Sequence, residues 1–302
     1  GYNMKIMVPL NPDYSVSELV QAGADGFYLG FIPNHWLNSF QNSNFINRRG
    51  HNLSVNFTEN TIINVLELCH KYNVPAYCTF NNHQYTQCEF EHIKCAINFL
   101  AEYNIDGIIA SDINVLEYCK TIHMPTTLST CATVYNRYAC EFYKLFGVNR
   151  IILPRDVKLS EMENIIASVP DVEWETFIYH SPCRFSESVC LSNHGLYGNI
   201  CKRFRNSPQI LCKNKEYKRI VDYYYNKPLG SCGLCEIYKM NQIGVSWLKI
   251  VERTLPNIVI KETCKKVKYA IDLINTVDSE SAFQRNVQYK EMCVRGNKCY
   301  YK

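Results

Sequence analysis

The stretch AYCTFNNHQYTQCEFEHIKCAINFLAEYNIDGIIAS, residues 76–111, decides the fold. It opens with a short apolar run at 76–81 and closes with another at 107–111. Between them, Ile93, Ile97 and Leu100 recur at helical spacing. Apolar runs joined by an amphipathic helix are typical of parallel strands with a crossover helix. The stretch therefore predicts one such unit of an α/β protein.

The same alternation continues through most of the chain. Apolar runs predict eight strands, at residues 5–10, 26–31, 76–81, 107–111, 126–130, 150–153, 176–180 and 246–251. Helical patterns between them lie at residues 15–22, 59–72, 89–103, 160–169 and 262–277. Eight strands in this alternation predict a closed TIM-barrel-like (β/α)8 barrel, as one domain over residues 4–302. An open doubly wound sheet is the alternative.

The alternation fails between residues 181 and 235. This stretch has no clean periodicity and holds six of the 16 cysteines. It lies between the last two predicted strands, so in a barrel it is a long insertion over one mouth. Such long loops usually carry function. We interpret it as a cysteine-rich, cluster-binding insertion, and residues 279–302 as a cysteine-containing tail.

Length and composition limit the class of protein. A chain of 302 residues can bury a full core without disulfides, so its 16 cysteines require their own explanation. The sequence shows no secretory signal, and we expect a reducing cytoplasm, where paired cysteines bind metal or perform redox chemistry. No apolar run approaches the roughly 18 residues that span a bilayer, so we expect no membrane association. The net charge of +4 neither requires nor excludes a nucleic-acid partner.

The cysteines of the insertion and tail are the metal-binding candidates. They are Cys183, Cys190, Cys201, Cys212, Cys232, Cys235, Cys293 and Cys299. Thiolates favour iron-sulfur clusters or zinc. Only Cys232 and Cys235 have a compact ligand spacing, which also suits dithiol redox chemistry. The other eight are predicted to be mostly small buried hydrophobic residues: Cys69, Cys78, Cys88, Cys95, Cys119, Cys131, Cys140 and Cys264.

Seven motifs in a fixed order resemble a known family. Six are GADGFYLG at 23–30, NFT at 56–58, YCTFN at 77–81, DGIIASD at 106–112, RIILPR at 150–155 and WLKIVER at 247–253. The seventh is the gap of six residues between Cys183 and Cys190. Together they are similar to the U32 peptidases, also called collagenase-like peptidases. The resemblance covers nearly the whole chain.

The resemblance implies a barrel and, in the better understood branches, a 4Fe-4S cluster held by four cysteines. Those branches hydroxylate ubiquinone precursors or RNA bases without oxygen, with prephenate as the implied hydroxyl source. The matching positions assign the cluster to Cys183, Cys190, Cys201 and Cys212. Arg205 stands where other branches have the second cysteine of a pair, so Cys232 or Cys235 is the alternative fourth ligand.

Four cysteines remain after this assignment. They are Cys232, Cys235, Cys293 and Cys299, and their number suits a second metal site. We expect either a second cluster or a structural zinc that ties the tail to the insertion.

Three cations at predicted strand ends are candidates for binding an anionic substrate. Lys249 and Arg253 lie at the end of the last strand, and Arg155 ends another. Barrel enzymes keep their chemistry at this end, where such cations could hold a dicarboxylate such as prephenate. Structural ion pairs are an equally weighted alternative. The family has glutamate and glycine where this chain has Val251 and Glu252, so a carboxylate role is lost or shifted by one residue.

His180 and His194 flank the first two cluster cysteines, and either could donate a proton near the metal. A polar loop residue is the favoured interpretation of both. A basic and aromatic segment over residues 202–225 could bind single-stranded RNA. A solvated loop face is slightly favoured there.

The sequence thus predicts an enzyme that performs oxygen-independent hydroxylation of a small-molecule, RNA or peptide substrate. We find no HExxH helix and no serine nucleophile elbow, so collagenase-like proteolysis is the second interpretation. The third is a non-catalytic, cluster-carrying subunit of a heteromeric complex, for example a heterodimer.

Overall fold

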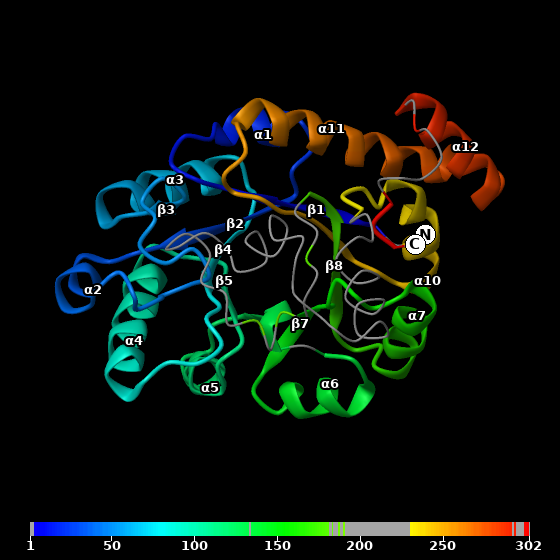
Figure 1. The fold of residues 1–302 in the computed structure, drawn as a ribbon. Helices are drawn as coiled ribbons and strands as arrows, with labels where there is room; N and C mark the ends of the chain where they lie inside the picture. The colour runs from blue at the N-terminus through cyan, green and yellow to red at the C-terminus, as the bar shows by residue number, and fades with distance from the viewer. Residues whose placement is uncertain are drawn as a thin grey trace, which may run out of the picture.

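The computed structural model describes residues 3–132, 134–180, 230–291 and 299–301, with the single residues 183, 187, 190 and 293. Eight parallel strands form a closed barrel with helices around it (Figure 1). They are β1 (Lys5–Pro9), β2 (Gly26–Phe31), β4 (Ala76–Phe80), β5 (Gly107–Ala110), β6 (Thr126–Leu128), β7 (Val148–Ile152), β8 (Glu173–Tyr179) and β9 (Trp247–Ile250). Because β1 pairs with both β9 and β2, the sheet has no free edge within this ring, and the open-sheet alternative is wrong.

All eight predicted strands are present. The largest difference is in β8, which begins at Glu173, three residues before the predicted start. Glu173 and Glu175 interrupt the apolar run that the prediction relied on. A ninth strand, β3 (Asn56–Phe57), pairs with β2 beyond Gly30 and was not predicted.

The helices fill the connections between strands. The predicted ones are α1 (Val16–Gln21), α3 (Glu59–Lys71), α4 (Gln87–Glu102), α7 (Leu159–Ser168) and α11 (Asn257–Leu273). Five more were not predicted: α2 (Asn34–Ser39), α5 (Ile113–Thr121), α6 (Arg137–Lys144), α10 (Ile237–Ile243) and α12 (Glu280–Lys290). Among the described residues, none of these helices is both long enough and apolar enough to cross a bilayer.

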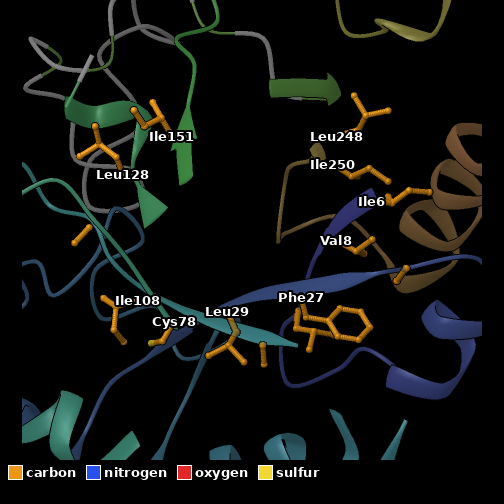
Figure 2. Packing of buried hydrophobic residues seen from close by; sticks show 14 of the residues in the cluster. Ile6, Val8, Phe27, Leu29, Cys78, Ile108, Leu128, Ile151, Leu248 and Ile250 are labelled. Atoms are coloured by element: carbon orange, nitrogen blue, oxygen red, sulfur yellow. The ribbon is translucent and has the colours of Figure 1, made fainter. Parts of the chain in front are cut away.

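Alternation along the strands separates two apolar regions. Outward-facing side chains such as Ile6, Leu29 and Ile151 pack under the surrounding helices and form the main core (Figure 2). A smaller cluster fills the barrel itself: Met7, Tyr28, Ile109, Ile152, Phe177, Trp247 and Val251. The barrel interior is therefore packed, and a ligand can only be bound at its mouths.

The predicted insertion leaves the barrel at the carboxyl end of β8 and returns beside it. His180 N donates to Ser231 O at 2.9 Å, and Gly233 N donates to Ile178 O at 2.8 Å. The chain then continues through a short 3-10 helix, Leu234–Glu236, into α10. Both ends of the insertion thus lie at the mouth that barrel enzymes use, while residues 191–229 lie outside the described part.

Candidate functional site

An ion network inside the barrel positions Lys249. Its Nζ lies 2.7 Å from Oε1 of Glu175, and both side chains are buried. Nη1 of Arg150 lies 3.7 Å from the other oxygen of Glu175. Burial lowers the pKa of Lys249, although the charge of Glu175 opposes this effect. The network fixes Lys249 with its Nζ 4.1 Å from the centre of the Tyr28 ring.

Arg253 is a buried cation whose positive charge is balanced by few neighbouring groups. Its side chain follows β9 and is 4% exposed, and Nη1 lies 3.5 Å from the carbonyl of Val55. Within the described ranges, no carboxylate forms an ion pair with it. Burial and the neighbouring charge of Arg49 lower the pKa of Arg253 to about 10, so it keeps its proton at neutral pH. A buried guanidinium in this state attracts an anion.

Gly30 makes room for this guanidinium. A Cβ at Gly30 would lie 2.4 Å from Nη1 of Arg253 and 1.9 Å from Oδ1 of Asn56. Any larger residue would displace both groups. Gly30, the last glycine of the GADGFYLG motif, therefore has a steric role at the mouth of the barrel.

Arg155 completes the cationic mouth from β7. Its guanidinium carbon lies 4.1 Å from the centre of the Phe177 ring, and Nη2 lies 3.5 Å from Oε1 of Glu187. Thr130 Oγ1 donates to the other oxygen of Glu187 at 2.7 Å. The Tyr28 phenol lies within electrostatic range of Arg155 and Arg253. The structure thus brings the three predicted cations together around Tyr28.

His180 does not join this group. Its Nε2 lies 2.7 Å from Oγ1 of Thr263, which belongs to α11 on the outer side of the barrel. Burial lowers the pKa of His180, so the imidazole is neutral at pH 7. The ring faces a helix, which does not match a proton donor at the mouth.

The two described cluster cysteines border the same mouth. Cys183 lies within electrostatic range of Arg155, and a nearby cation favours the thiolate that metals require. The carbonyl of Cys190 lies 3.0 Å from Nε2 of His83. Both cysteines are partly exposed, unlike the buried core cysteines. The other two predicted ligands, Cys201 and Cys212, and also His194, lie outside the described residues.

The four cysteines of the predicted second site gather at one corner. Cys232 and Cys299 form a parallel backbone bridge, and Gln288 Nε2 lies 4.0 Å from the sulfur of Cys235. Cys293 lies within electrostatic range of Cys235. However, no group of three or more ligating side chains in the described part of the chain is arranged to hold a metal ion. Burial raises the pKa of Cys235 to about 11, so its thiol is neutral at pH 7 in this structure.

Glu252 occupies a strained position between Lys249 and Arg253. Its φ is 84°, in the left-handed region that favours glycine, and Oε1 lies 3.1 Å from Nη2 of Arg49. The family motif has glycine here, and the backbone of this chain keeps the glycine conformation. The carboxylate is turned toward Arg49.

Other residues of the mouth and core were not singled out from the sequence. Tyr28 and Tyr300 lie at the mouth and Glu175 lies below it inside the barrel. A period-two pattern in β8 and β2 would have placed Glu175 and Tyr28 inside the barrel. Of the eight predicted core cysteines, six are buried, whereas Cys88 and Cys95 on α4 are exposed, so the core interpretation is wrong for those two.

A hollow of about 470 Å³ lies at the opposite, amino-terminal mouth of the barrel. Lys5, Asp25, Arg150 and Trp247 are among its lining residues. It is separated from the three cations by the packed barrel interior.

The fold defines a (β/α)8 barrel protein with three cations gathered at the carboxyl-end mouth. The model of peptidase family U32 matches residues 14–301, so the chain belongs to this family.

Relatives of the chain carry two kinds of name. It is 24% identical over 318 residues to a collagenase of Porphyromonas gingivalis, covering 97% of this chain and 72% of that one. It is 26% identical over 235 residues to tRNA hydroxylation protein P of Helicobacter pylori, covering 72% and 55%. It thus spans about half the length of the latter relative. A solved U32 peptidase is 14% identical with a TM-score of 0.45, covering 59% of this chain and 70% of that one.

Proposed function

We propose that this chain is an iron-sulfur enzyme that hydroxylates its substrate without oxygen, using an anionic donor such as prephenate. The observation that supports this most is Arg253, a buried cation with no carboxylate partner among the described residues. It lies at the carboxyl end of a barrel beside Lys249 and Arg155. A dicarboxylate would compensate such a mouth through charge-assisted hydrogen bonds.

The three cations have different roles in this proposal. Arg253 and Arg155 bind the carboxylates of the donor. Lys249 is already paired with Glu175, so it contributes positive potential and supports the Tyr28 ring. His180 has no role in donor binding because its ring contacts α11.

The proposed cluster site comprises Cys183, Cys190, Cys201 and Cys212, with Cys232 or Cys235 as the alternative fourth ligand. Cys183 fits this role because it is partly exposed and lies beside a cation. A 4Fe-4S cluster would supply electron transfer at the mouth. Cys232, Cys235, Cys293 and Cys299 remain candidates for a second cluster or a structural zinc.

Relatives named tRNA hydroxylation protein favour a tRNA substrate over a small molecule or a peptide. The basic and aromatic segment that would contact RNA, residues 202–225, lies outside the described part of the chain. Two other functions stay open as outcomes of the tests below. The collagenase relative favours proteolysis, and a heteromeric partner would make this chain a cluster-carrying subunit.

Metal analysis after anaerobic purification tests the cluster. We expect about four irons and four sulfides per chain, or more if a second cluster forms. Cys183→Ser and Cys190→Ser should lose this iron, while the exposed Cys95→Ser should retain it. Iron-free protein from iron-replete cells, or equal iron in all variants, would contradict the cluster proposal.

Mass analysis of tRNA tests the reaction. Cells lacking their own tRNA hydroxylation proteins would express this chain and receive prephenate labelled with heavy oxygen at its hydroxyl. We expect labelled oxygen in tRNA, which Arg253→Met should abolish. Unlabelled tRNA combined with peptide hydrolysis by the purified chain would support the peptidase instead. Labelling that appears only with a co-purifying protein would support the heteromeric subunit.

A further inference from the structure

The end of the chain lies at the mouth of the barrel, far in sequence from the strands it contacts. Tyr300 N donates to the carbonyl of Cys232 at 2.8 Å. A Cβ at Gly230 would lie only 1.6 Å from the carbonyl oxygen of Cys299, so the two backbones are in close contact there. The segment 299–301 is therefore held against the loop that precedes α10, at the carboxyl end of β8.

Tyr301 anchors this segment through a satisfied hydroxyl. The hydroxyl donates to the carbonyl of Phe177, and Oγ1 of Thr176 lies 2.8 Å from it. Because the Tyr301 proton is used by Phe177, Thr176 is the donor of the second bond. Both partners belong to β8, so Tyr301 has a structural role.

Tyr300, the adjacent residue, differs in its hydroxyl. Its ring packs against the apolar cluster inside the barrel. Its hydroxyl oxygen is buried, and the hydroxyl proton has no acceptor among the residues that the structure describes. A buried hydroxyl without a partner is destabilising, which makes it a signal of an absent acceptor.

The surroundings of this hydroxyl indicate which acceptor fits. Arg155 is close enough to donate a hydrogen bond to the hydroxyl oxygen, and Glu187 and Cys183 lie within electrostatic range of it. Arg155 is one of the two cations proposed to bind the anionic donor. An oxyanion held by Arg155 would bring an acceptor to the Tyr300 hydroxyl, whereas a cation or an apolar group would leave the hydroxyl proton without an acceptor.

We infer that Tyr300 contacts the ligand, and that its hydroxyl donates a hydrogen bond to a carboxylate bound by Arg155. The tail is thus part of the binding site in addition to any structural role. The inference rests on the proposed function only in taking the mouth as an anion site. The class of ligand it names is a small carboxylate.

Two neighbouring tyrosines provide a matched test. Tyr300→Phe and Tyr301→Phe each remove one hydroxyl and keep the ring. Binding of prephenate, malonate and succinate is measured by calorimetry and by the thermal midpoint of each purified protein. Tyr300→Phe should bind the carboxylates about tenfold more weakly while its thermal midpoint without ligand stays equal or rises. Tyr301→Phe should show a lower midpoint and an unchanged affinity.

The outcomes separate the inference from the proposed function. Binding of malonate or succinate that weakens in Tyr300→Phe, with no binding of prephenate, would remove the proposed donor and keep the inference. Equal affinity of the wild-type chain and Tyr300→Phe would overturn the inference alone. It is also overturned if Tyr300→Phe fails to fold, since the hydroxyl would then be structural. Absence of binding by all three carboxylates would overturn both.

Discussion

The ammonium group of Lys249 lies 2.7 Å from a carboxylate oxygen of Glu175, and both groups are inside the barrel. Arg150 approaches the same carboxylate from the other side at 3.7 Å. Glu175 therefore lies between two buried cations, of which Arg150 also pairs with Glu173 at 2.9 Å. Glu175 supports the cationic mouth from below, although it belongs to no sequence motif of the family that we identified.

Removing this anion should be costly. Glu175→Gln leaves Lys249 and Arg150 without their shared partner, and we expect a loss of about 3–5 kcal/mol in the free energy of unfolding. Glu173→Gln is the comparison, because Glu173 also pairs with Arg150 at 2.9 Å but its side chain is 44% exposed, and it should lose less than about 1 kcal/mol. Urea unfolding of the three proteins measures both values. Similar losses in the two variants would show that the network is not centred on Glu175.

The strained backbone at Glu252 predicts an unusual order of stability. Glycine adopts a φ of 84° without strain, whereas alanine does not. Both substitutions remove the ion pair with Arg49, so the two variants differ only in the backbone strain at residue 252 and in the presence of one methyl group. We expect Glu252→Gly to be more stable than Glu252→Ala by roughly 1 kcal/mol. Equal unfolding midpoints would mean that the backbone there relaxes.

A methyl group at Gly30 should damage the anion site. Gly30→Ala pushes on Asn56 and Arg253, and overpacking of this kind costs about 1–3 kcal/mol. Carboxylate binding should weaken as well. The control is Gly147→Ala, where φ is 79° but the added Cβ meets only the flexible side chain of Lys120. Gly147→Ala should lose stability without losing carboxylate affinity, and calorimetry distinguishes the two variants.

Four partly buried histidines should make the stability of the fold sensitive to acid. Burial lowers the pKa of His35, His51, His83 and His180 below the ordinary value of 6.5. A base with a lowered pKa binds its proton more readily in the unfolded chain, so stability is complete above about pH 6.5 and falls as the pH drops below it.

His35 provides the clearest case, since its Nδ1 lies 2.8 Å from Nδ1 of His92 and only one of the two atoms can donate the hydrogen bond. His35→Gln should therefore reduce the loss of stability between about pH 7.5 and pH 5.5, measured by urea unfolding at each pH. The exposed His123→Gln should leave that loss unchanged. A wild-type protein that is equally stable at both values would contradict the prediction.

Much of the barrel could be predicted from the sequence because its strands are short apolar runs bounded by polar turns. Helices were harder to predict. The helix α6 has only eight residues and buries only Cys140, while Tyr138 and Phe142 are exposed, so few apolar positions mark it as a helix. In α11, exposed Ile258 and Val259 lie in the first turn, so the true start at Asn257 was missed by five residues.

Site residues could be predicted from the sequence only where they stand at the end of a predicted strand. Lys249, Arg253 and Arg155 stand at strand ends, and parallel strands bring those ends to one mouth. Glu175 was missed because the predicted strand began after it. Tyr300 was missed for a different reason: its contact with Cys232 joins segments far apart in the chain, and no local pattern encodes such a pairing.

The hydrogen bond from His180 to Ser231 has a consequence for how the molecule tolerates change. It holds the two ends of the insertion side by side, so the fifty residues between His180 and Ser231 start and finish at neighbouring positions on the barrel. Lengthening or exchanging an insertion of this kind costs little conformational entropy, because the entropy of loop closure depends only weakly on loop length. The barrel can therefore keep its architecture while this segment is lengthened or exchanged, provided that Glu187 and Cys190 keep their contacts with Arg155 and His83.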